Sequence, residues 1–426
     1  MPARLPSVVA GLAAGVGLVF AGTPAAAPGR PAVQGPPPLS VPDGGMRQDA
    51  LPQLVAAGLN VNNFLQLQRA RDDYGVDGDG LAAAILDTGV HTDHVELKPR
   101  VADKLNFTVK PNDAVVTDVS GHGTAVAGLV VGGEVGIAPG AKVIAMKVLL
   151  AKTEPQPANA QDAYDAILDA LNWVLKNHAE KKISVVNVSM SDMKHHQSEA
   201  DALVFDQTKA IAKAIADLRD KRVAVVVAAG NEYHRFNRKG LKLPAARPGM
   251  SFPAVVSATV SVGAVFDSNG PPIPPRPGEQ PPPWKLTQCV ENRICPFSQR
   301  LHPPPQNGGT DIYAPGQEMV SLGIHKNNNG VANSTNTGTS SAAPVVTGVI
   351  LLMQQEYKKR TGELPKVDDL EAWLRDGGVK CIDDPHDDDD VEHTKQHYSR
   401  LNALGAMEQV STALKRRELK DGVVPK

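Results

Sequence analysis

Short apolar runs alternate along the chain with segments whose apolar residues recur at every third or fourth position. Four of the apolar runs predict strands, at residues 81–86, 142–150, 183–189 and 222–229, and the continuous run 81–86 is typical of a strand buried on both faces. A helical period predicts helices at 159–178 and 198–218, the second with Ser198 as a possible cap. Strands and helices that alternate in this way indicate an α/β fold, a doubly wound parallel sheet with helices on both faces.

Three polar residues stand at the edges of such segments. Asp87 directly follows the first apolar run, so we expect it at the carboxyl end of a strand, where open α/β sheets place their sites. His122 opens a stretch of small and apolar residues that is typical of a tightly packed helix. Ser340 opens a second buried helix at 340–353, which tolerates Pro344 because this residue falls near the first turn. We expect all three side chains to converge on one rim of the sheet.

The three residue types together indicate nucleophilic chemistry. A serine hydroxyl attacks a carbonyl near neutral pH when an imidazole takes its proton, and the imidazole needs a carboxylate to orient it. Each short block, taken alone, is more often a turn or a helix cap without chemistry. The indication therefore comes from the order of the blocks and from the strand and helices that carry them.

Several blocks also resemble a known family. Leu-Asp-Thr-Gly at 86–89, Gly-His-Gly-Thr at 121–124 and Gly-Thr-Ser-Ser-Ala-Ala-Pro at 338–344 resemble, in this order, the active-site sequences of the subtilisin-like serine peptidases. Residues 223–231 resemble the family strand that ends in the oxyanion-hole asparagine. The resemblance extends over about residues 65–410. Further similar segments lie at 186–190, 312–316 and 400–406.

The resemblance implies a role for each candidate residue. Ser340 would attack a peptide carbonyl, His122 would act as general base and then general acid, and Asp87 would orient the imidazolium. The side chain of Asn231 and the backbone N–H of Ser340 would bind the oxyanion on the way to an acyl-enzyme. An extended substrate would pair with a strand edge. The substrate-binding residues implied are Ser189, Met190, Ser191, Ala228, Ala229 and Gly230.

Two of these positions bear on specificity. Ser191 stands where the family usually has glycine, so its side chain could narrow or reshape the substrate cleft. The small residues at 228–230 keep the expected lining beside the residue before the scissile bond. We expect a broad preference for apolar or medium-sized side chains there.

The two ends of the chain differ in composition from the rest. Residues 1–27 combine an early arginine, an apolar stretch and a final Ala-Ala-Ala, the layout of a secretory signal peptide, with an uncleaved anchor or a mobile tail as alternatives. Residues 28–64 are rich in Pro, Gly and Ala and predict a linker or short pro-segment, shorter than the folded propeptide common in the family. The peptidase domain is expected at 65–410 and a charged tail at 411–426. We expect a secreted or periplasmic protein with no membrane span in the mature chain.

Charge and composition narrow the partners. Lys and Arg total 44 against 46 Asp and Glu, a net charge of −2 that gives no sign of a nucleic-acid partner, so we expect peptide or protein substrates. No cofactor or metal site is assigned. Calcium, which the family often binds, remains possible with Glu96 as a lone ligand, but residues 132–139 leave no room for the longer loop that many relatives use. The acidic run at 383–393 is interpreted as a solvated loop.

A proline-rich insertion at 267–310 contains two of the three cysteines. We expect it at the surface, either in contact with substrate or another protein or as a tolerated loop. Cys289 and Cys295 are close enough to form a disulfide after export, which would leave Cys381 free; other pairings and three reduced thiols stay open.

Two other functions fit part of the pattern. A catalytically silent member of the family could bind peptides through the same cleft, although the complete set of candidate residues argues against it. An esterase or amidase of the α/β-hydrolase type would need Gly-x-Ser-x-Gly with the serine first, whereas here the serine comes last. The sequence therefore predicts a secreted serine endopeptidase, with a silent peptide-binding protein as the alternative.

Overall fold

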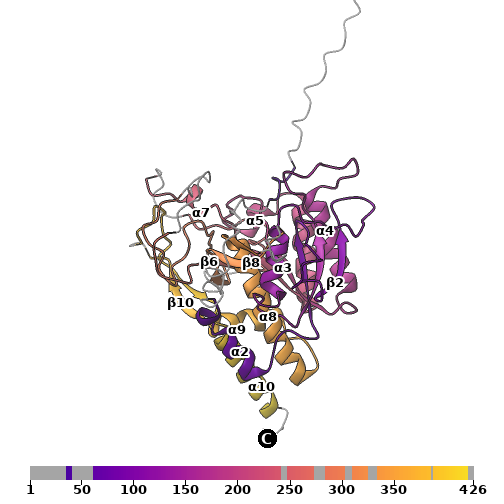
Figure 1. Cartoon of the computed structure of the whole chain (residues 1–426). Helices are drawn as coiled ribbons and strands as arrows, with labels where there is room; N and C mark the ends of the chain where they lie inside the picture. Colours follow the sequence, from indigo (N-terminus) through magenta and orange to yellow (C-terminus); the bar gives the residue numbers. More distant parts are fainter. Residues whose placement is uncertain are drawn as a thin grey trace, which may run out of the picture. The chain divides into compact units, whose positions relative to one another are not determined.

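The computed structural model divides the chain into two units, Met1–Gly35 and Pro36–Lys426, and the fold below is that of the second (Figure 1). The signal peptide expected at 1–27 lies outside the described residues. The structure describes residues 35–40, 61–240, 247–272, 284–302, 309–324, 333–384 and 387–420.

A nine-stranded sheet forms the centre, in the order β10-β11-β7-β6-β5-β4-β1-β3-β2. Every neighbouring pair is parallel except β10 and β11, which run antiparallel. Its strands are β1 (Ala82–Asp87), β2 (Val101–Asn106), β3 (Lys142–Lys147), β4 (Ile183–Val188), β5 (Ala224–Ala228), β6 (Val260–Val265), β7 (Ile312–Pro315), β10 (Val379–Ile382) and β11 (His397–Arg400). A separate antiparallel pair consists of β8 (Met319–Leu322) and β9 (Asn333–Asn336).

Helices cover both faces of the sheet. Successive residues of β1 point to opposite faces, so Ala83 and Ile85 pack in the core that contains α3 and α8, while Ala84 and Leu86 pack in the core that contains α4 and α6. Figure 1 shows α2, α9 and α10 grouped around the end of α8. The helices are α2 (Leu67–Tyr74), α3 (His122–Val131), α4 (Ala163–Asn177), α5 (Glu199–Ala202), α6 (Asp206–Asp220), α7 (Tyr233–Phe236), α8 (Thr339–Thr361), α9 (Val367–Asp376) and α10 (Ala403–Lys420). The doubly wound α/β architecture expected from the sequence is confirmed.

The order of strands defines where a site can form. From β1 the chain places β3 on one side and β4 on the other, so the sheet changes winding direction between β1 and β4. Helices that leave these strands toward opposite faces leave a crevice at the carboxyl ends. Asp87 ends β1 at this point.

One predicted helix is interrupted. The segment 198–218 was expected as a single helix, but it forms α5 and α6 with a break at 203–205, where Phe205 is extended (φ −106°, ψ 152°). Ser198 caps α5, as expected, because its hydroxyl accepts a hydrogen bond from the Asp201 N–H. The apolar spacing continues across the break, so periodicity alone does not reveal it.

Two segments differ from the sequence-based expectation. The segment 411–420, expected as part of a charged tail, is the second half of α10, and Leu414 is buried on its inner side. The insertion at 267–310 is not a purely surface segment, because residues 294–301 are all buried in the described structure. Backbone bridges join Val265 to Ile294 and Gly249 to Arg300, which draws this part of the insertion into the core.

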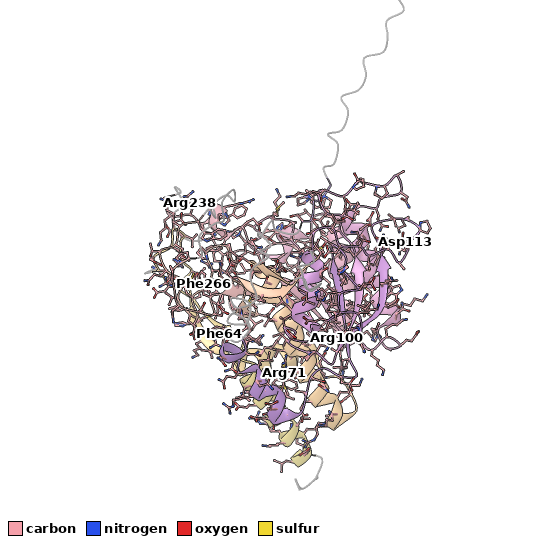
Figure 2. All side chains as sticks on the ribbon, viewed as in Figure 1. Phe64, Arg71, Arg100, Asp113, Arg238 and Phe266 are labelled. Carbon is pink, nitrogen blue, oxygen red and sulfur yellow. The ribbon has the colours of Figure 1, made fainter. Side chains whose placement is uncertain are left out.

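Two arginines, both labelled in Figure 2, donate hydrogen bonds to the short loop after α3. The guanidinium of Arg71 donates to the carbonyl of Ile137 at 2.7 and 3.1 Å, and that of Arg100 donates to the carbonyl of Pro139 at 2.7 Å. Glu96 accepts a hydrogen bond from the Glu134 N–H at 3.0 Å, so its carboxylate caps the same loop.

Among the described helices, none combines the length and apolarity that a membrane crossing requires.

Candidate active site

Strand register brings two polar residues to neighbouring positions at the carboxyl edge of the sheet. Leu86 of β1 lies opposite Val188 of β4, so the next residues, Asp87 and Ser189, follow side by side. Neighbouring strands are about 4.8 Å apart. Asp87 and Ser189 are both fully buried. These two side chains anchor the amino ends of the two helices that carry the other candidate residues.

Asp87 binds the first of these helices through His122. Nδ1 of His122 and Oδ1 of Asp87 are 2.8 Å apart, and the same Oδ1 accepts the Thr88 N–H at 2.7 Å. A carboxylate on Nδ1 fixes the imidazole with Nε2 free to exchange a proton. Burial acts to lower the pKa of His122, but the charge and hydrogen bond of Asp87 outweigh it and the pKa is raised.

Two glycines let the helix approach this closely. A Cβ on Gly123 would lie 2.0 Å from the carbonyl oxygen of Gly89 and 3.0 Å from Cβ of Asp87. Gly89 itself has φ +112°, a conformation that residues with side chains rarely adopt. The spacing between α3 and β1 is therefore set by backbone contact.

A second buried carboxylate, Asp118, supports the start of α3 and was not singled out from the sequence. Its Oδ1 accepts from Thr88 Oγ1 at 2.9 Å and from the Gly121 N–H at 2.8 Å. Its Oδ2 accepts from the N–H and hydroxyl of Thr124 at 2.8 and 2.7 Å. Burial raises the pKa of Asp118, the hydrogen bonds from Thr124 oppose the shift, and the charge of Asp87 adds to it.

Ser340 lies at the amino end of α8, whose position depends on Ser189. The Ser189 hydroxyl donates to the backbone carbonyl of Ser340 at 2.9 Å. Ser189 in turn accepts from Asn187 Nδ2 at 2.9 Å, and Asn187 accepts from the Thr347 hydroxyl at 2.9 Å. This chain of buried polar groups fixes the start of α8 against the end of β4. Pro344 lies within the first turns of α8, as expected.

Asn231 presents its amide to the same place. The side-chain carbonyl oxygen of Asn231 accepts hydrogen bonds from the N–H and the hydroxyl of Thr339 at 2.8 and 2.9 Å. The NH2 group of Asn231 therefore points away from Thr339. A Cβ placed on Gly338 would lie 2.9 Å from Asn231 Nδ2 and 3.0 Å from Ser340 Oγ. The amide donor and the serine hydroxyl therefore border one small space, as an oxyanion site requires.

The remaining contact of the expected set is not made. In the part of the chain that the structure describes, no hydrogen bond joins the Ser340 hydroxyl to His122. Catalytic hydrogen bonds are often long or misaligned without substrate and tighten when it binds. The structure thus brings together His122 with Asp87 at the end of β1, and Ser340 with Asn231, which follows β5.

The predicted substrate-binding residues lie around this edge but differ in what they offer. The side chains of Met190, Ala228 and Ala229 are buried in the cores. Gly230 has φ +111° and its N–H donates to the Thr339 hydroxyl at 3.2 Å. The backbone of Ser191 is already paired with that of Ser40.

The acidic run is not the solvated loop expected from the sequence. Asp383, Asp387 and Asp389 are buried. His393 lies between two carboxylates, 2.8 Å from Asp383 on Nδ1 and 2.9 Å from Asp389 on Nε2. Burial alone would lower the pKa of His393, but the two carboxylates raise it to about 9.

Cations of this chain compensate the buried carboxylates. Nε of Arg300 lies 3.0 Å from Asp383, and Nε of Arg293 lies 2.8 Å from Asp387. Ligand-type atoms of Asp387, Asp389 and His393 lie within 4.8 Å of one another, so these three could hold a metal ion. The arginines and the protonated histidine already balance the charge there.

The favoured Cys289–Cys295 disulfide is not formed in the structure, where all three cysteines are free and buried. Burial raises the pKa of Cys289 to about 11 and that of Cys381 to about 12. Cys289 is held by backbone hydrogen bonds to Gly270, and the N–H of Cys295 donates to Ala264. The two thiols are thus fixed by separate pairings of the insertion.

A buried aspartate on an imidazole, with a serine at a helix amino end beside an amide donor, is typical of hydrolases with a serine nucleophile. Comparison with known proteins defines the family. The profile of the Subtilase family matches residues 78–376, so this chain belongs to the subtilase family, peptidase S8.

The individual relatives are distant, and the fungal one is longer than this chain. The chain is 27% identical over 300 residues to a subtilisin-like protease of Coccidioides posadasii (strain C735), covering 69% of this chain and 57% of the relative. It is 26% identical to the major intracellular serine protease of Bacillus subtilis (strain 168), covering 68% of this chain and 74% of that protein. The chain thus spans little more than half the length of the fungal relative.

A solved structure supports the fold. Fervidolysin from Fervidobacterium pennivorans, described as a keratinolytic enzyme related to subtilisin, superposes with a TM-score of 0.54 at 19% identity. The match covers 83% of this chain and 45% of fervidolysin.

Proposed function

We propose that the protein is an exported serine endopeptidase that cleaves peptide bonds through Ser340, His122 and Asp87. The 2.8 Å contact between His122 Nδ1 and the buried Asp87 carboxylate is the observation that carries this proposal. A carboxylate on Nδ1 orients the imidazole and stabilises the imidazolium that forms when Nε2 accepts a proton.

Each step uses a residue of the candidate site described above. His122 Nε2 takes the proton of Ser340 as its hydroxyl attacks the peptide carbonyl, and Asp87 stabilises the imidazolium that forms. Nδ2 of Asn231 and the Ser340 N–H donate to the oxyanion. The imidazolium then protonates the leaving amine, and water repeats the sequence to release the acyl group.

The substrate is proposed to be an extended peptide with a broad choice of apolar or medium-sized residues before the scissile bond. The small residues at 228–230 and the extension of β4 at 189–191 support this proposal. A peptide-library profile dominated by cleavage after basic residues would contradict it. Export rests on the signal-peptide layout of residues 1–27.

A serine-directed phosphonylating probe tests the mechanism. Intact mass should show one adduct on the purified protein, none on Ser340→Ala, and an unchanged adduct on Ser341→Ala. Ser341 is the matched control because it is the next hydroxyl in α8 and is equally buried. Labelling that persists in Ser340→Ala would overturn the assignment of the nucleophile.

A silent peptide-binding protein is the second candidate. It is favoured by one observation, namely that the backbone of Ser191 already holds a segment of this same chain. Absence of any adduct on a protein that is folded by circular dichroism would move this candidate ahead.

A further inference from the structure

A segment far from the site in sequence lies on the strand edge expected to bind substrate. The N–H of Ser40 donates to the carbonyl of Ser191 at 2.8 Å, and the N–H of Ser191 donates to the carbonyl of Ser40 at 3.0 Å. The pairing is antiparallel. Both backbone groups of Ser191 that could bind an added strand are therefore occupied.

Two further contacts hold this segment in place. Leu39 is only 5% exposed and belongs to the core that contains α4. The hydroxyl of Tyr164, in the first turn of α4, donates to the carbonyl of Pro37 at 2.7 Å. Polyproline-like chain such as residues 36–38 is extended before it binds, so ordering it costs little entropy. Residues 36–40 are therefore held against the domain by the bridge at Ser40, the burial of Leu39 and the hydrogen bond to Pro37.

The register relates this strand to the nucleophile. Ser189 contacts the backbone of Ser340, and Ser191 lies two residues further along, about 7 Å away at the rise of a strand. Segment 189–191, which continues beyond β4, runs away from Ser340, so a peptide that pairs with it in the antiparallel sense runs toward Ser340. Its residue opposite Ser191 is then the third before the scissile bond, if the residue nearest the nucleophile lies opposite Ser189.

We propose that residues 36–40 are a built-in wall of the substrate cleft, which occupies the place of the third and fourth substrate residues before the scissile bond. This inference rests on the proposed peptidase function. The enzyme then binds the amino-terminal side of its substrate through the two residues next to the scissile bond. Residues further upstream gain nothing from the strand edge, because its hydrogen bonds are already made.

One position offers a matched pair of variants. Ser40→Pro removes the N–H that donates to Ser191 and places a ring against that carbonyl, so it should release the segment. Ser40→Ala keeps both backbone hydrogen bonds and removes a buried hydroxyl that has no hydrogen-bond partner among the described residues, so it should leave the segment in place. Leu39→Asp should release the segment by a different route, because it places a charge in a buried position.

The test compares a blocked dipeptide anilide with a blocked tetrapeptide anilide that ends in the same two residues. The wild type and Ser40→Ala should cleave both with similar kcat/KM. Ser40→Pro and Leu39→Asp should raise kcat/KM for the tetrapeptide by about tenfold or more and leave the dipeptide unchanged, the size expected when two backbone hydrogen bonds become available. A rise for both substrates alike would mean that the segment blocks the whole cleft, and an unchanged ratio would mean that it occupies no subsite.

A second readout does not depend on catalysis. In the Ser340→Ala background, Ser40→Pro should increase hydrogen exchange at the Ser191 amide, whereas Ser40→Ala should not. Equal protection in both variants overturns the proposed wall. If the phosphonate probe fails to label any folded variant but exchange behaves as expected, the peptidase function fails while the strand contact stands, and the proposed role in subsite choice fails with it.

Discussion

The hydroxyl of Thr88 donates a hydrogen bond to Asp118 at 2.9 Å and lies 3.2 Å from the carboxylate of Asp87. One threonine thus joins the carboxylate that binds His122 to the carboxylate that caps its helix. Because both acids are buried, the charge on Asp118 reaches the imidazole with little screening and adds to the raised pKa of His122.

Replacing Asp118 should therefore shift the pH profile. His122 must be neutral to accept a proton, so kcat/KM should rise with pH through an apparent pKa above 6.5 in the wild type. Asp118→Asn removes one negative charge and should move this acid limb to lower pH. It should also cost about 2–3 kcal/mol of stability, because an amide cannot accept all four hydrogen bonds.

The measurement is kcat/KM against pH together with urea unfolding. Asp93→Asn is the control, since that carboxylate is 80% exposed and should alter neither. An acid limb that stays in place in Asp118→Asn would show that Asp118 does not act on His122.

The oxyanion donor gives a prediction about turnover. Asn231→Ala should lower kcat by about 100- to 1000-fold, the loss measured for one such donor in subtilisin, with little change in KM. Thr339→Val removes the hydroxyl that orients the Asn231 carbonyl and should reduce kcat less, while Thr339→Ser should restore it. A loss in KM alone would assign Asn231 to substrate binding.

The buried His393 predicts a loss of stability in alkali. Because the two carboxylates raise its pKa in the folded protein to about 9, its contribution is fully present below pH 6.5 and is lost as the pH rises through 9. Urea unfolding should show a decrease of the order of 2–3 kcal/mol over this window. The His393→Gln variant should be less stable than the wild type at pH 6, and its free energy of unfolding should not change over this pH window. His397→Gln, at an exposed position of β11, should match the wild type.

The cysteines predict a thiol count. With the pKa of each thiol raised by burial, a thiol reagent at pH 8 should react slowly with the native protein. After unfolding, three thiols per chain should react. A count of one would show that Cys289 and Cys295 pair during export after all.

How far the sequence reaches depends on the kind of interaction. Asp87 and His122 stand in recognisable blocks at the ends of an apolar strand and the start of a small-residue helix, so local pattern predicts both, and the structure confirms that they meet. Asp118 lies only four residues before His122, yet nothing in its neighbours shows that it is buried. Its importance arises from burial, which sequence alone does not give.

The acidic run shows the opposite case. Its charge density indicates solvent exposure as long as only neighbours in sequence are considered. In the fold Arg300, which is 83 residues away in sequence, is completely buried against Asp383. The guanidinium carbon of Arg300 also lies 3.5 Å from the centre of the Tyr233 ring. Compensation over such distances depends on tertiary structure. The same holds for Ser40 and Ser191, which no local pattern connects.

The contact of Gly123 with Gly89 has a consequence for how this protein can change. Most core substitutions act on their surroundings through side-chain volume, as adjacent residues shift to fill or vacate space. Where α3 meets the end of β1, the contact is between two glycines and involves no side chain. Substitutions further along α3, for example at Leu129, should therefore change the distance between His122 and Asp87 little. The contact between His122 and Asp87 can therefore stay the same while the residues of the surrounding core change.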